Sequence, residues 1–160
     1  MKLLGTLVVG AALAGLLSSG RLAAQTADNF LGTWKLNVAK SKYEAGQAPK
    51  ELTVTFEKAG ATGVKITAKG TNADSSAINT VYTPTYDGKD APVTGSPDFD
   101  AAALKMLDAN TRHTVRKKAG KEVQVVHSVL AKDGKSFTAT TTGVNAKGVK
   151  VNSTAVFEKQ

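Results

Sequence analysis

Apolar and polar residues alternate along most of the chain, and this alternation constrains the fold more than any other feature. Residues 52–57 (LTVTFE) carry Leu, Val and Phe at every second position, and residues 149–157 (VKVNSTAVF) repeat the pattern. A period of two in segments rich in Val and Thr is typical of strands that bury one face. The pattern predicts strands near residues 32–37, 51–57, 63–69, 77–86, 91–94, 103–108, 111–118, 121–131, 136–143 and 149–159.

Short turn signals separate these segments. Asp87-Gly88, Asp133-Gly134 and residues 145–148 (NAKG) supply the residue types that accept the positive φ angles of tight hairpins. Consecutive hairpins make an antiparallel meander, and a long meander closes on itself to remove its exposed edges. We therefore predict an all-β fold, a single antiparallel up-and-down β-barrel of about 8–10 strands.

Two segments admit another interpretation. Residues 98–108 (DFDAAALKMLD) contain three consecutive alanines and would suit a short helix after a capping Asp, although we assign them to a strand. Residues 38–50, which include Gly46 and Pro49, are expected to form a connecting loop and not a pair of helices.

The first 24 residues differ from the rest of the chain. Lys2 precedes an apolar run over residues 3–17, and small residues follow that run. This is the order of a cleavable secretory signal peptide. The alternative is an uncleaved membrane anchor, which needs roughly 20 apolar residues, more than the run supplies. We expect a signal peptide at 1–24, export to the periplasm or the extracellular space, and no transmembrane segment after processing.

The exported chain would be basic and free of cysteine. Without Lys2 and Arg21, 19 basic residues stand against 13 acidic ones, a net charge of +6. That sign favours an anionic partner such as an envelope polymer, although lysines scattered over turns and strands also serve solubility and protect strand edges. No tight basic run is interleaved with aromatic residues, so we expect no specific nucleic-acid partner. The absence of cysteine excludes thiol catalysis and zinc sites with cysteine ligands.

Both ends of the predicted barrel resemble a known family. Residues 29–36 (NFLGTWKL) contain a G-x-W motif that resembles the first strand of the lipocalins and fatty-acid-binding proteins, which belong to the calycin superfamily. Residues 154–159 (TAVFEK) resemble the last strand of the fatty-acid-binding proteins. The whole chain is similar to small exported bacterial lipocalin-like proteins. The resemblance implies a lipocalin-like β-barrel domain over residues 25–160.

The resemblance also implies how the barrel is closed and where the chain departs from the family. In this interpretation Gly32 lets the chain enter the barrel tightly, and the Trp34 ring closes one end and stacks on an arginine. The barrel-closure residues are Gly32, Trp34, Arg112 and Arg116. The fatty-acid-binding proteins hold a carboxylate with an Arg and a Tyr on the last strand, where this chain has Ala155 and Phe157. This chain is expected to share the barrel of that family but not its carboxylate clamp.

If the apolar side chains face inward, a few polar side chains share the interior with them. His127 then lies inside with Val125 and Val129, and His113 lies inside on the neighbouring strand. A mainly apolar cavity with a few polar groups is typical of a small-molecule site. The candidate ligand-binding residues are Tyr82, His113, His127, Thr141 and Ser153.

Each of these assignments has a plainer alternative. A histidine on an apolar strand face can be a core residue satisfied by one hydrogen-bond partner. Over residues 77–86 the inward set is either the one that contains Tyr82 or the one that contains Val81. A barrel of this size can also be filled by its own side chains, which leaves no cavity.

The sequence offers little to catalysis. The chain has only two histidines, and its acidic residues lie mostly in turns, where they serve turn geometry. Asp98 and Asp100 form the closest acidic pair, with no nucleophile or second base beside them. We therefore expect no catalytic residues, no metal, no cofactor and no enzymatic activity.

Two functions remain. The first is an exported barrel that binds a small apolar or amphipathic molecule inside. The second is a filled, ligand-free barrel that associates with an anionic envelope polymer or another protein through its basic surface. Salt distinguishes them, because attraction between exposed charges weakens as the ionic strength rises.

Overall fold

The computed structural model describes residues 28–44 and 46–160 and contains only strands and turns in that part of the chain. The predicted signal peptide at 1–24 lies outside the described residues. Over the described ranges, no helix has the length and apolar character to cross a membrane. The strands are β1 (Gly32–Lys42), β2 (Glu51–Ala59), β3 (Gly63–Thr71), β4 (Ala77–Tyr82), β5 (Asp87–Thr94), β6 (Ala101–Asp108), β7 (Thr111–Lys118), β8 (Lys121–Leu130), β9 (Ser136–Val144) and β10 (Lys150–Lys159).

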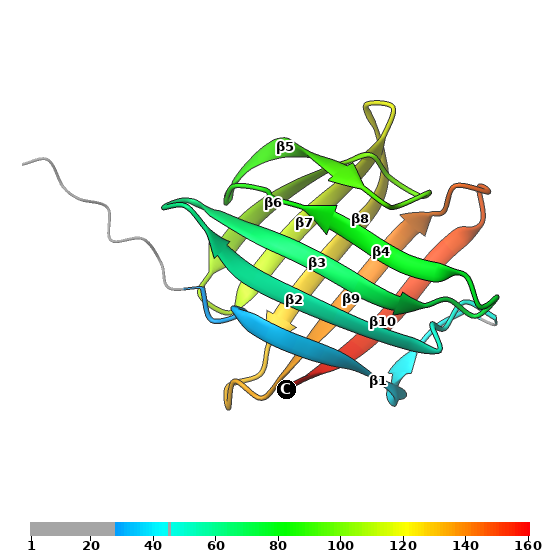
Figure 1. Cartoon of the computed structure of the whole chain (residues 1–160), viewed down its shortest axis with the longest axis horizontal. Coiled ribbons are helices and arrows are strands. Elements are labelled where there is room, and N and C mark those ends of the chain that lie inside the picture. Colours follow the sequence, from blue (N-terminus) through cyan, green and yellow to red (C-terminus); the bar gives the residue numbers. More distant parts are fainter. Residues whose placement is uncertain (1–27, 45) are drawn as a thin grey trace, which may run out of the picture.

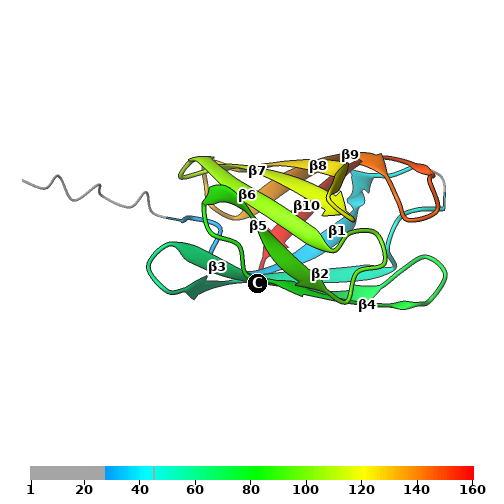
Figure 2. The same ribbon diagram turned by 90° about the horizontal axis from the view of Figure 1, so that it is seen from above.

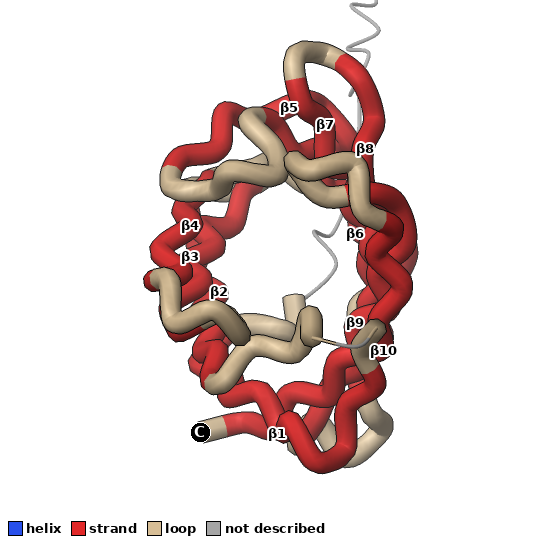
Figure 3. The backbone as a smooth tube through the Cα atoms, turned by 90° about the vertical axis from the view of Figure 1, so that its right-hand side faces the viewer, coloured by secondary structure: helices blue, strands red, loops and turns tan. Residues whose placement is uncertain are grey.

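Every strand pairs with its neighbours in the sequence, and β10 returns to pair with β1, so the sheet closes into a barrel (Figures 1 and 2). The closing ladder is antiparallel and places Trp34 opposite Lys159 and Leu36 opposite Phe157. Viewed from one end, the strands form a complete ring (Figure 3). The predicted all-β, up-and-down barrel is therefore confirmed, with ten strands.

Several boundaries differ from expectation, among them that of β5, which begins at Asp87 and not at residue 91. Residues 101–108 form β6, which confirms the strand and removes the helix alternative. β4 ends at Tyr82, and its pairing with β5 covers only two residue pairs. β1 continues to Lys42, so the first residues of the expected loop 38–50 belong to a strand.

A bulge explains the extra length of β1. The register with β10 shifts between Asn37 and Lys42. Ser41 bridges the bulge, because its Oγ donates to the Asn37 carbonyl oxygen at 2.6 Å and accepts from the Val156 N–H at 2.9 Å. These bonds satisfy backbone groups that a regular ladder would have paired.

Aromatic side chains form the core at the end of the barrel where the described chain begins. Phe30 and Trp34 are fully buried there and pack edge-on against Phe137, with ring centroids 5.5 and 5.0 Å away. Phe137 also stacks on Phe157 at 4.7 Å. The Trp34 Nε1–H donates to the Phe30 carbonyl oxygen at 2.7 Å, so the one polar atom of the indole is satisfied inside the core.

The predicted inward set of β8 is wrong. His127 is exposed and Val129 is 43% exposed, whereas Val126, of the opposite parity, is 6% exposed. The cause lies in the neighbouring strand, whose inward side chains are Arg112 and Thr114 and whose outward face holds His113. Because polar residues line the interior on this side, counting apolar residues selected the wrong face.

Replacing one inward and one outward valine of β8 by alanine should show by the loss of stability which face is buried. We expect Val126→Ala to lower the free energy of unfolding by about 1–2 kcal/mol, because it removes buried methyl groups. Val129→Ala, the matched control on the outer face, should cost less than about 0.5 kcal/mol. Urea unfolding followed by circular dichroism measures both. The reverse order would contradict this assignment of inside and outside.

Candidate functional site

The barrel interior holds a cavity of about 640 Å³. It opens between the loops that join β1 to β2, β3 to β4, β5 to β6 and β9 to β10, which lie together on the right-hand side of Figure 1. Residues from these loops, such as Gln47, Asp74, Pro97 and Lys147, line the mouth. Tyr43 also lines it, and burial raises the pKa of the Tyr43 hydroxyl to about 12.

The cavity has an apolar wall and a polar wall. β2, β3 and β4 contribute mainly hydrocarbon and aromatic surface, from Leu52, Val54, Phe56, Ile66, Ile78 and Tyr82. β7 to β10 contribute hydroxyl, amide and guanidinium groups as well, from Thr114, Arg116, Gln124, Ser128, Thr141 and Ser153. The ladder registers place Arg116 opposite Gln124 and Thr141 opposite Ser153, so these groups are near neighbours.

A buried ion pair closes the far end of the cavity. The guanidinium of Arg112 on β7 binds the carboxylate of Asp28, and the Tyr86 hydroxyl donates to the same carboxylate at 2.5 Å. The side chains of Arg112 and Asp28 are only 3% and 5% exposed. Burial lowers the pKa of Arg112, against the attraction of Asp28. Burial and the bond to Asp28 raise the pKa of Tyr86. The segment before β1 is thereby fixed across the barrel end.

Arg112 is held between aromatic rings as well. Its guanidinium carbon lies 4.2 Å from the ring centroid of Phe30 and 4.6 Å from that of Phe56. These are cation–π distances, and they add to the attraction of Asp28 where water is excluded. The Nε and Nη1 groups of Arg112 are buried without a hydrogen-bond partner in the described structure.

Arg116 occupies a different environment on the same wall. Its Nη1 donates to Gln124 Oε1 at 2.9 Å, and Gln124 Nε2 donates in turn to the Val144 carbonyl oxygen at 3.2 Å. The guanidinium carbon lies 4.6 Å from the ring centroid of Phe99, and Nε is buried without a partner. No carboxylate in residues 28–44 or 46–160 forms an ion pair with Arg116.

Three of the five candidate ligand-binding residues line the cavity, and two do not. Tyr82, Thr141 and Ser153 lie on its wall, so the set with Tyr82 is the inward one on β4. His113 and His127 sit opposite each other on the outer face, because β7 and β8 turn their other parity inward. The placement of both histidines inside is therefore wrong. Ligand contact by the other three stays a prediction.

The predicted closure residues are buried or tightly placed, but their partners differ from expectation. Gly32 has a φ of 129°, a conformation that favours glycine, at the start of β1. The cation near the Trp34 ring is Lys159, whose Nζ lies 5.2 Å from the centroid. Both arginines lie over phenylalanine rings, so the predicted stacking of an arginine on Trp34 is wrong. The strand register explains why a lysine and not an arginine lies near the Trp34 ring, because Lys159 is the residue directly opposite Trp34.

The sequence contained a signal for the polar wall, but choosing the inward face by its number of apolar residues concealed it. In residues 112–116 (RHTVR) the arginines and Thr114 share one parity, and such a set can face inward when its charge has a partner. That partner, Asp28, lies 84 residues earlier in the chain. Phe99 and Gln124, which hold Arg116, were likewise not among the candidates.

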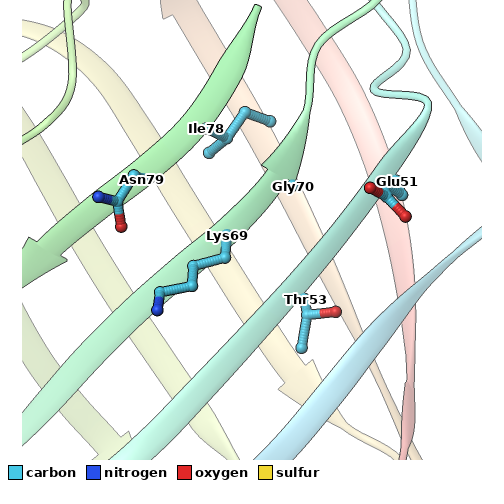
Figure 4. Close-up of a pocket in the computed structure, with 6 residues that line it drawn as sticks. All are labelled: Glu51, Thr53, Lys69, Gly70, Ile78 and Asn79. Carbon is cyan, nitrogen blue, oxygen red and sulfur yellow. The ribbon is translucent and has the colours of Figure 1, made fainter.

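Other parts of the described chain offer no comparable site. No group of three or more potential metal ligands occurs among the described residues. A second depression lies over the outer face of β2, β3 and β4, lined by Glu51, Thr53, Lys69, Gly70, Ile78 and Asn79 (Figure 4). The charged ends of Glu51 and Lys69 point away from each other there, so they do not converge on a common ligand.

Known structures share this fold at low sequence identity. No known protein-family profile and no curated protein sequence matches the chain. The fluorescent protein UnaG is 14% identical with a TM-score of 0.52, and the alignment covers 82% of this chain and 97% of UnaG. EF1p2_mFAP2b bound to DFHBI is 14% identical with a TM-score of 0.50, covering 82% and 94%. Zebrafish ileal bile acid-binding protein is 11% identical with a TM-score of 0.46, covering 82% and 99%. The likeness to UnaG and EF1p2_mFAP2b shows that the chain shares their β-barrel fold.

Removing the carboxylate that closes the barrel should be costly. We expect Asp28→Asn to lower the free energy of unfolding by about 3 kcal/mol, because it leaves the buried Arg112 without a counter-charge. Asp90→Asn is the matched control, since Asp90 forms an exposed ion pair with Lys117 and should cost less than about 1 kcal/mol. Thermal and urea unfolding measure both. Equal losses would show that Asp28 does not hold the barrel end.

Proposed function

We propose that the protein is exported and binds a small, largely apolar or amphipathic molecule inside its barrel. The observation that carries this proposal is the cavity of about 640 Å³, closed at one end by Asp28 and Arg112 and open at the other. Small-molecule sites are clefts of roughly 300–1,000 Å³ with mainly apolar walls and a few convergent polar groups. Binding without catalysis is the activity we expect, because no nucleophile is paired with a base on the walls described above.

The closed sheet surrounds this cavity. Every strand pairs with a neighbour on both sides, so the wall is continuous around the interior. EF1p2_mFAP2b, which has the same fold, was solved bound to DFHBI. That complex supports the idea that a barrel of this kind can take a small molecule.

The cavity favours this function over the filled-barrel alternative. A barrel that acts only through its basic exterior has no need of an interior space of this size. The two also respond differently to salt, because exposed charge pairs are screened and a neutral molecule held inside the barrel is not. Binding of a neutral probe should therefore persist at about 1 M salt, where the Debye length is roughly 3 Å.

A bulky residue inside the barrel should block binding. The neutral fluorescent probe N-phenyl-1-naphthylamine should bind the wild type, and Ala139→Trp should weaken that binding about 10-fold or more by filling the cavity. Thr138→Trp, one residue earlier on β9 and facing outward, should leave the affinity unchanged. Fluorescence titration gives both dissociation constants. Equal affinity for wild type and Ala139→Trp would place the probe outside the barrel and overturn the proposal.

Export has its own test. After secretion from a bacterial host, the recovered chain should begin near Gln25, as measured by intact mass and N-terminal sequencing. Leu13→Arg, which breaks the apolar run, should accumulate as unprocessed precursor. Leu107→Arg changes an exposed residue of the barrel and should be processed normally. Recovery of the full chain from the periplasm would contradict a cleaved signal peptide.

A further inference from the structure

The two arginines on the cavity wall differ in their charge balance. Arg112 at the closed end is paired with the Asp28 carboxylate. Arg116 lies four residues further along β7, roughly 13 Å along the strand in the direction of the mouth, since a strand advances about 3.3 Å per residue. Among the described residues, its guanidinium contacts the Gln124 amide oxygen and the Phe99 ring and no carboxylate. Arg116 is half-buried, and a charge withdrawn from water without a counter-ion is costly, because the interior replaces little of the lost hydration.

The surroundings of Arg116 leave room for an anion. Its Nε lies buried and unpartnered, and the residue lines the cavity. The other charged groups at this end are Asp74, Asp98 and Lys147. Asp74 accepts hydrogen bonds from Ser76, and Asp98 Oδ1 accepts the Ala146 N–H at 2.8 Å, so the described contacts of both carboxylates are made within the loops. Lys147 adds a positive charge to the mouth.

From this difference we propose that the ligand is a small organic anion whose carboxylate or sulfonate group binds Arg116, with its apolar part directed toward the closed end. The proposal rests on the proposed function, because it places that group in the same cavity. Arg112 is not the anion site, since a second anion beside it would be repelled by Asp28. The carboxylate completes the hydrogen bonding of Arg116 and supplies the counter-charge that the described chain does not.

The proposed site for the acid group therefore differs from the carboxylate clamp on the last strand of the fatty-acid-binding proteins, where this chain has the uncharged Ala155 and Phe157. Arg116 lies on β7, and the neighbouring Gln124 fixes its orientation through the Val144 carbonyl. A guanidinium held in this way presents a fixed direction for its free Nε–H. Charge-assisted hydrogen bonds of this kind are about twice as strong as neutral ones, which makes the acid group decisive for affinity.

Two probes that differ in one acid group test the proposal. 8-Anilinonaphthalene-1-sulfonate carries a sulfonate that N-phenyl-1-naphthylamine lacks. Arg116→Met should weaken binding of the sulfonate probe about 10- to 100-fold and change binding of the neutral probe less than about 3-fold. Arg116→Lys should keep much of the sulfonate affinity, because it keeps the charge. Lys105→Met, on the outer face of β6, removes the same charge from the surface and should change neither affinity.

The possible outcomes separate the two proposals. If neither probe binds the wild-type barrel, the proposed function fails. If both bind and Arg116→Met leaves the sulfonate affinity intact, cavity binding stands and the assignment of Arg116 is overturned. Retained binding of the neutral probe shows that a variant is folded. Should Arg116→Met not fold, Arg116→Gln, which keeps a hydrogen-bonding side chain without the charge, gives the same comparison.

Discussion

The ladder between β1 and β10 gives this molecule an interior. Without it, ten strands would form an open sheet with two exposed edges, and every inward side chain would face solvent. The ladder also positions the aromatic core, since it places Leu36 beside Phe157 and brings Trp34 against Phe137. The cavity, the burial of Arg112 and the closed end all follow from this single pairing of the first strand with the last.

Local patterns predicted the strands well because strands and turns are local features. The period of two and the Gly- and Asp-rich turns identified all ten strands, including β6 with its helix-like Ala-Ala-Ala. The inward faces of β7 and β8 could not be predicted in the same way. Burying Arg112 is acceptable only because Asp28 meets it, and that contact depends on closure of the whole barrel. Tyr82, Thr141 and Ser153 were correctly placed inside because they share the parity of the inward apolar residues of β4, β9 and β10.

Arg112 and Arg116 lie on the same strand but have different surroundings and different roles. At the closed end, Arg112 carries its own counter-charge and two flanking rings, so it acts as a structural clamp. Nearer the mouth, Arg116 has one ring and one amide, which orient it without neutralising it. The Asp28 segment reaches fully buried Arg112 and supplies its counter-charge, whereas half-buried Arg116 has no carboxylate of the described chain beside it.

Pairing Trp34 with Lys159 has a consequence for how the chain reaches its native state. The strand against which β1 must rest, β10, is the last of the ten strands along the described chain. Closure therefore joins Trp34 to a residue 125 positions later (159 minus 34), an arrangement of high contact order that slows folding.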